Sequence, residues 1–156
     1  MRRGPASDCL PKPNGERAAR GQDGRRWPWG DAWQWRLANG GGEKKGQDIQ
    51  DTGTEKDGYI YAAPVGSYPE GRSPAGCDDM AGNVAEWCAD WYQGDYYASA
   101  PAENPAGPGR GTYRVVRGGS SRNTPSYMRC AVRDHHEPEF RNFTLGFRCA
   151  KDWESH

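Results

Sequence analysis

The sequence lacks the features that mark several classes of protein. It contains no run approaching the ~18 apolar residues of a membrane-spanning helix, and no apolar leader follows Met1-Arg2-Arg3. Lys plus Arg and Asp plus Glu number 21 each, so the zero net charge gives no reason to expect nucleic acid or anionic lipid as a partner. The five cysteines include no C-x-x-C pair, which argues against a zinc or dithiol redox motif.

Apolar residues are also scarce. They make up 34% of the chain, and the mean hydropathy is −1.08. Glycine and proline, at 22 and 12 residues, indicate a loop-rich fold, while seven Trp and eight Tyr supply the area for a small aromatic core. We therefore expect residues 1–156 to form one domain with a flexible lead over residues 1–9, stabilised by a metal ion, a disulfide or a partner.

The C-terminal third alternates apolar and polar residues, as half-buried strands do. This alternation predicts strands at Tyr113–Arg117, Met128–Arg133 and Leu145–Ala150, with a long polar loop at Asp134–Thr144. We therefore expect an α+β fold in which a small antiparallel sheet carries long loops.

Three other segments carry weaker signals. Tyr59–Ala63 is a short apolar run typical of a strand, whereas the apolar spacing within Asn83–Trp91 suits a helix. Near the start of the chain, Pro13 and Gly15 oppose a helix, so a helical turn is expected only at Glu16–Arg20.

Two carboxylates and an amide lie within eight residues of one another around a glycine. They are Asp79, Gly82, Asn83 and Glu86, and Trp87 follows directly as an aromatic anchor. Oxygen ligands of this kind are those that Ca²⁺ prefers. The alternative is that Asp79 and Glu86 cap turns and pair with arginines.

Six motifs occur in an order that points to a known family. They read LPKPNGERAARG (10–21), GRRWPWGD (24–31), APVGSYP (63–69), DDMAGNVAEWCADWY (78–92), RVVRGGS (114–120) and LGFRCA (145–150). Together they resemble the formylglycine-generating enzyme family, also called sulfatase-modifying factors. The resemblance implies a C-type-lectin-like fold with a strand at Asn83–Trp91. Because the family domain has an N-terminal half before the first of these motifs, we expect residues 10–156 to correspond to its C-terminal half.

The resemblance also implies two Ca²⁺ sites. The first would use the side chains of Asp79 and Glu86 with the carbonyls of two residues between them, Gly82 and Val84. The second would use the side chains of Asn39 and Asp57 with the carbonyls of Gly40 and Tyr59. Single Asn and Asp residues in loops are usually turn formers, which is the alternative for the second set.

The chain departs from the family at the position of its copper site. Formylglycine-generating relatives bind copper through two cysteines, five residues apart, shortly after the GGS motif. Here residues 121–129 contain no cysteine before Cys130, and Met128 alone cannot supply the thiolates that Cu(I) needs. We therefore expect no bound copper and assign no catalytic residue. The adjacent His135-His136 pair is more simply a solvent-exposed loop than a metal site.

Two polar segments, 121–127 and 134–144, have the composition of an adaptable binding surface. Their candidate ligand-binding residues are Arg122, Asn123, Tyr127, His135, His136 and Phe140. In relatives diversified by retroelements, this region is the variable ligand-binding face; ordinary surface loops are the alternative.

The leading hypothesis is a non-catalytic, Ca²⁺-stabilised binding or accessory module. It would take a small-molecule or peptide ligand and associate with a protein partner or with itself. The alternative is an oxidoreductase of the same family, formylglycine-generating or similar to the iron sulfoxide synthases. That enzyme would act together with an N-terminal part or a partner chain.

Overall fold

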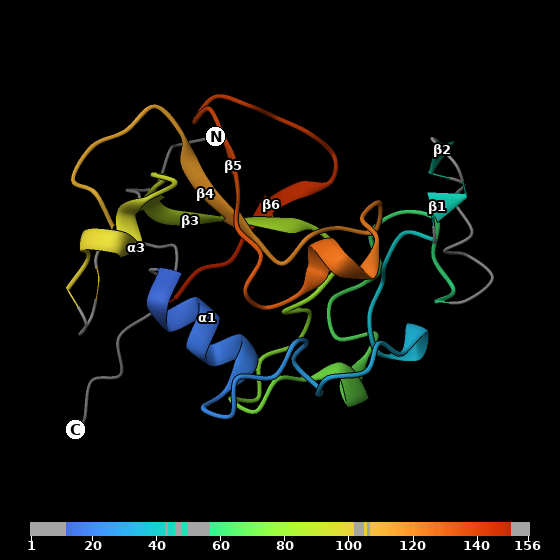
Figure 1. Cartoon of the computed structure of the whole chain (residues 1–156). Helices are drawn as coiled ribbons and strands as arrows, with labels where there is room; N and C mark the ends of the chain where they lie inside the picture. Colours follow the sequence, from blue (N-terminus) through green and yellow to red (C-terminus); the bar gives the residue numbers. More distant parts are fainter. Residues whose placement is uncertain are drawn as a thin grey trace, which may run out of the picture.

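Short elements alternate with long loops in the computed structural model, which describes residues 12–42, 44–45, 48–49, 57–101, 105 and 107–150 (Figure 1). The helical elements are α1 (Lys12–Arg20), α3 (Tyr96–Ser99) and 3-10 turns at Trp35–Leu37, Pro69–Gly71 and Pro125–Met128. The strands are β1 (Lys44–Lys45), β2 (Asp48–Ile49), β3 (Ala85–Trp91), β4 (Arg114–Arg117), β5 (Asp134–His136) and β6 (Leu145–Phe147). The predicted α+β class is confirmed.

The main sheet has four strands in the order β5-β4-β3-β6. β4 runs antiparallel to both β3 and β5, but β6 runs parallel to β3. Trp87 of β3 therefore lies between Val116 of β4 and Phe147 of β6. The sheet is mixed rather than wholly antiparallel, since the chain reaches β6 by crossing from the far edge of the sheet instead of through a hairpin. A two-stranded antiparallel ladder, β1-β2, lies apart from it.

Two of the predicted strands are present, and Asn83–Trp91 contains the strand that the resemblance implied. The strand predicted at Met128–Arg133 is wrong. Met128 ends a 3-10 turn, and the backbone N–H of Cys130 donates to the Arg26 carbonyl instead of to a neighbouring strand. The alternation there reflects two separately buried side chains, Met128 and Cys130, rather than a pleated strand.

Two further predictions need correction. The segment Asp134–Thr144 was expected to be a loop, but it begins with β5, where His135 pairs with Val115 of β4. Within Tyr59–Ala63 no strand forms, because the N–H and carbonyl of Ala63 bond to the side chain of Asn83.

Helix α1 begins at Lys12, earlier than the single turn expected at Glu16–Arg20. Pro13 lies in the first turn, where a backbone N–H has no acceptor within the helix. Because proline lacks only this N–H, it costs the helix no hydrogen bond there. Gly15 costs roughly 1 kcal/mol in a helix interior. Tertiary contacts offset that cost, because Glu16 forms an ion pair with Arg117 of β4 and the Ala19 side chain is buried. The helix thus lies against one side of the sheet (Figure 1).

The core centres on one thioether. Met128 is fully buried, as are Val115 and Val116 of β4. A Cβ added to Gly40 or Gly119 would lie 2.5 Å or 2.7 Å from Met128 side-chain carbons. Two loops distant in sequence therefore approach Met128 so closely that a side chain at either glycine would have to displace the flexible thioether, which fills the space between them.

A tryptophan cluster packs beside this core. The ring of Trp33 lies 5.7 Å from that of Trp27 and 5.3 Å from those of Trp29 and Trp35. Trp27 Nε1 donates to the Pro125 carbonyl at 3.0 Å, so the cluster also positions the turn that carries Met128.

Two glycines with the same backbone angle provide a matched test of close packing. Gly76 and Gly82 both have φ +79°, but a Cβ at Gly76 would meet nothing, whereas one at Gly82 would overlap the Asn39 carbonyl. Gly76→Ala should lower the free energy of unfolding by about 1–2 kcal/mol, the cost of a left-handed backbone. Gly82→Ala should cost about 1–3 kcal/mol more, because it adds overpacking. Urea unfolding measures both, and equal losses would contradict the close approach.

Candidate functional site

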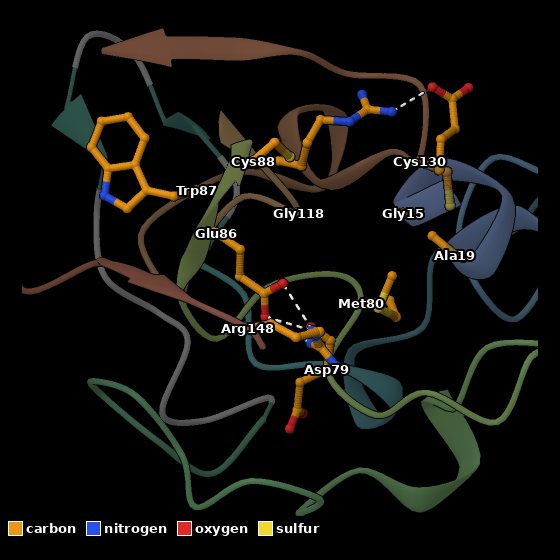
Figure 2. Close-up of a pocket in the computed structure, with 12 residues that line it drawn as sticks. Gly15, Ala19, Asp79, Met80, Glu86, Trp87, Cys88, Gly118, Cys130 and Arg148 are labelled. Carbon is orange, nitrogen blue, oxygen red and sulfur yellow. Dashed lines mark hydrogen bonds and ion pairs between the residues drawn. The ribbon is translucent and has the colours of Figure 1, made fainter. Parts of the chain in front are cut away.

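In the first predicted cation segment, Asp79–Glu86, an arginine binds one of the two carboxylates. The Glu86 carboxylate, on β3, accepts hydrogen bonds from Arg148 Nε at 2.9 Å and Nη2 at 2.7 Å (Figure 2). Arg148 Nη2 also donates to the Asp79 carbonyl at 3.3 Å, and the Asp79 carboxylate accepts from the Gly66 N–H. The hydrogen bonds to Glu86 raise the pKa of Arg148. A cation at this segment would therefore share Glu86 with a guanidinium.

Asn83 joins this segment to the second one. It is buried with a left-handed backbone, φ +64°. Its amide Oδ1 accepts from the Ala63 N–H at 2.9 Å, and Nδ2 donates to the Ala63 carbonyl at 3.2 Å. Its backbone N–H donates to the Asn39 carbonyl at 2.8 Å, and its carbonyl accepts from the Ser121 N–H at 2.9 Å. Four loops therefore meet at one residue.

The second predicted cation set is brought together by the fold. Asp57 Oδ2 accepts from the Gly40 N–H at 2.9 Å, and Oδ1 accepts from the Tyr59 N–H at 3.0 Å. Asn39 is 1% exposed, and its Nδ2 donates to the Tyr61 carbonyl at 2.7 Å. Within the described part of the chain, Asn39 Oδ1 is buried and has no hydrogen-bond partner. An unpaired buried oxygen costs about 1–3 kcal/mol, so these residues fit an oxygen-seeking cation.

The chemistry of these ligands favours a hard cation. Across the described ranges, no three or more His, Cys, Asp or Glu side chains gather where they could hold a metal ion. A cation at Asn39 and Asp57 would therefore rely on amide, carbonyl and carboxylate oxygens, which suit Ca²⁺ better than a transition metal.

The structure divides the six predicted ligand-binding residues into two groups. In the first, after β4, Asn123 Oδ1 accepts from both the N–H and the hydroxyl of Ser120 at 2.9 Å, so Asn123 holds the loop together. The Arg122 guanidinium lies 5.5 Å from the Tyr61 ring and 6.0 Å from the Phe143 ring. Tyr127, in the following turn, is exposed.

The second group lies on β5 and the loop after it. The His135 ring stacks on Tyr92 at 4.0 Å, while the His136 ring stacks on Phe140 at 4.3 Å. The two histidines are neighbours on a strand and therefore point to opposite faces of the sheet. This geometry gives them separate aromatic environments rather than one shared site.

Sequence reasoning missed two aromatic residues beside Arg122. Tyr61 and Phe143 are 58% and 68% exposed, and their rings lie 6.1 Å apart in an edge-to-face contact. We call these three residues the Arg122 cluster. No motif or period links Tyr61 to Phe143, because they meet only after the chain has folded.

A cavity of about 50 Å³ lies between α1 and the sheet. The ion pairs Glu16–Arg117 and Glu86–Arg148 form part of its wall, together with Met80, Cys88 and Cys130 (Figure 2). Burial raises the pKa of the Cys130 thiol to about 11. Cys130 is therefore a neutral thiol at pH 7, which is neither a good nucleophile nor a ready metal ligand.

A domain family described as "Sulfatase-modifying factor enzyme 1-like domain" matches residues 10–153. The chain belongs to this family. Over 146 residues it is 42% identical to a formylglycine-generating enzyme of Streptomyces coelicolor, covering 88% of this chain and 44% of that protein. The resemblance proposed from the six motifs is thereby confirmed.

Two solved structures share the fold. PvdO from Pseudomonas aeruginosa superposes with a TM-score of 0.70 at 26% identity, covering 90% of this chain and 50% of that chain. Treponema denticola variable protein 1 superposes with a TM-score of 0.71 at 27% identity, covering 90% and 46%. The chain thus spans about half the length of these relatives. No helix in the described ranges has the length and apolar character to cross a membrane.

The thiol of Cys130 makes stability depend on pH. In the unfolded chain the Cys130 thiol loses its proton near pH 8.5, whereas in the folded chain the pKa of this thiol is about 11. Between these values the folded state binds more protons, so stability falls as pH rises, by up to about 1.4 kcal/mol per pH unit. Urea unfolding at pH 8, 9 and 10 should show this fall, and Cys130→Ala should make it shallower. An unchanged slope in the variant would contradict the assignment.

Proposed function

We propose that this chain is a non-catalytic, Ca²⁺-stabilised binding or accessory module of the sulfatase-modifying factor family. The Arg122 cluster carries the proposal. It follows the RGGS motif, in the region where the family resemblance expects copper-binding cysteines. Here that position presents a guanidinium beside two exposed rings, and the next cysteine along the chain is the neutral, buried Cys130.

The Arg122 cluster has the chemistry of a recognition surface. Arginine presents five donors in a planar fork that matches a carboxylate, and Tyr61 and Phe143 offer rigid apolar area at little entropic cost. Contact with the rings contributes roughly 0.5–1 kcal/mol and holds the guanidinium in place. A peptide or small molecule with a carboxylate next to an apolar group fits this surface best.

Calcium would serve a structural role. Asn39 and Asp57 would bind it through their side chains, and Gly40 and Tyr59 through their carbonyls. The buried oxygen of Asn39 supports this set. When bound, the ion supplies positive charge that offsets the burial of these oxygens. A second ion at Asp79, Gly82, Val84 and Glu86 would compete with Arg148 for the Glu86 carboxylate.

An oxidoreductase role is the second candidate, and the 42% identity to a formylglycine-generating enzyme favours it. Such an enzyme would need metal ligands from outside the loop that follows RGGS. Those ligands would come from an N-terminal part of the domain or from a partner chain.

Calcium should stabilise the folded chain. At 100 times its dissociation constant, Ca²⁺ should raise the free energy of unfolding by about 2.7 kcal/mol, or roughly 5–10 °C in Tm, relative to a chelator. Asp57→Asn should abolish this increment. Asp78→Asn should keep it, because Asp78 pairs with Arg72 and belongs to neither predicted set. Thermal unfolding with and without Ca²⁺ measures all three proteins, and an equal increment in Asp57→Asn would contradict the site.

The chain should bind peptides without oxidising them. Peptides ending in an apolar residue with a free carboxylate should bind, and Arg122→Ala should weaken binding at least tenfold, about 1.4 kcal/mol. Arg129→Ala is the matched control, since Arg129 is exposed nearby but lies outside the Arg122 cluster. With Cu(I) and oxygen, mass spectrometry should find a cysteine-containing peptide unchanged by this chain and converted by the Streptomyces relative. Conversion by this chain would favour the oxidoreductase role.

A further inference from the structure

The predicted calcium set and the Arg122 cluster are joined by a hydrogen bond. Asn39 belongs to the calcium set, and its Nδ2 donates to the Tyr61 carbonyl at 2.7 Å. Tyr61 belongs to the Arg122 cluster, where its ring lies 5.5 Å from the guanidinium. Tyr59, whose carbonyl is in the calcium set, comes only two residues before Tyr61. The calcium set therefore positions one aromatic member of the Arg122 cluster.

The arginine of the cluster is positioned by the same stretch of chain. Gly41, two residues after Asn39, is buried, and a Cβ there would lie 2.6 Å from the backbone carbonyl carbon of Arg122. The Asn39 carbonyl accepts from the Asn83 N–H at 2.8 Å. The Asn83 carbonyl in turn accepts from the N–H of Ser121, the residue before Arg122, at 2.9 Å. Residues 39–41 thus contact both sides of the Arg122 cluster, directly or through one residue.

The two ends of the Asn39 amide are in different situations. Among the described residues, nothing bonds to its buried Oδ1, whereas its Nδ2 holds the Tyr61 carbonyl. A cation at Oδ1 draws electron density from the amide and strengthens the N–H donor at its other end. Without a cation the buried oxygen has no partner, which favours other orientations of the amide and weakens its bond to Tyr61.

We propose that calcium bound at Asn39 and Asp57 raises the affinity of the Arg122 cluster for its ligand, so that the ion regulates binding as well as stabilising the fold. The inference rests on the proposed function, because it couples the two sites named there. The two states of the chain differ in one contact. With the ion, the Asn39 amide holds Tyr61 beside Arg122, and without it this contact is weaker.

Coupling between two binding sites is reciprocal. If calcium raises the affinity for a peptide by some factor, the bound peptide raises the affinity for calcium by the same factor. Such factors are typically about 5- to 150-fold. An ion that touched the peptide carboxylate directly would obey the same rule, so a variant at Asn39 is needed to assign the coupling to its amide.

Calorimetric titration of the full chain tests the coupling. The probe is a short peptide that ends in leucine with a free carboxylate. It is titrated in saturating Ca²⁺ and in chelator at one ionic strength, because salt screens the attraction between arginine and carboxylate. We expect at least about fivefold tighter binding with Ca²⁺, and calcium affinity raised by the same factor when the peptide is saturating.

Three variants separate the calcium site from the coupling. Asp57→Asn should bind the peptide with the affinity of the chelated chain, whether or not Ca²⁺ is present. Asp78→Asn is the matched control and should keep the full factor, because Asp78 pairs with Arg72 and lies outside both predicted calcium sets. Asn39→Asp keeps an oxygen for the ion but has no N–H for the Tyr61 carbonyl. It should still bind calcium, while its peptide affinity changes less than twofold with the ion.

Several results would overturn the inference. Equal peptide affinity with and without Ca²⁺ would do so while leaving both proposed sites intact. Retention of the factor by Asn39→Asp would mean that the ion acts on the peptide directly. Loss of the folded circular dichroism spectrum in chelator would make calcium a requirement for folding alone. If thermal unfolding shows no calcium increment, or if no peptide binds, the proposed function fails and the inference fails with it. The unsubstituted chain supplies the reciprocal titrations even if a variant does not fold.

Discussion

The buried amide of Asn83 is the constraint on which the arrangement of loops depends. Its side chain satisfies both backbone groups of Ala63, while its own backbone bonds to Asn39 and Ser121. A buried backbone group without a partner is costly, so a single residue that joins four loops through its side chain and its backbone removes several such costs at once. The left-handed conformation at Asn83 also determines how β3 leaves the turn. Because neighbouring residues of a strand alternate, the side chains of Glu86 and Trp87 then point to opposite faces of the sheet.

The two faces of the sheet follow from this arrangement and differ in chemistry. Beneath α1, two ion pairs bring the helix and the C-terminal arginine to the sheet. Opposite α1, aromatic rings stack on one another with little cover. The small core around Met128 lies beside the sheet and depends on glycines that let loops approach closely. A chain with only 34% hydrophobic residues thus holds its loops with hydrogen bonds and ion pairs more than with apolar volume.

The sequence predicted this structure where the signal was local. β4 and β6 alternate in the expected way, and the six ordered motifs identify the family. Prediction failed where tertiary contacts decide the outcome. Helix α1 tolerates Gly15 because Glu16 forms an ion pair with Arg117. The pattern around Met128 resembles that of a strand, but it arises because Met128 and Cys130 are buried separately. The contact of Tyr61 with Phe143 has no local signal at all. Of the candidate site, Asn39, Gly40, Asp57 and Tyr59 lie close together in the fold, and calcium there stays a prediction. The sequence offered an arginine partner for Glu86 as the alternative to a cation, and only the fold shows that this partner is Arg148.

The parallel pairing of β3 with β6 has a consequence for biosynthesis. β3 ends at Trp91, but the strand that completes one of its edges spans Leu145–Phe147. A ribosome therefore releases the centre of the sheet long before the edge strand emerges. During that interval the β3 edge has unpaired backbone groups, which are a template for pairing with other chains. The sheet therefore cannot be completed before residues 145–147 have left the ribosome, and a nascent chain stalled before residue 145 would be a natural client for chaperones.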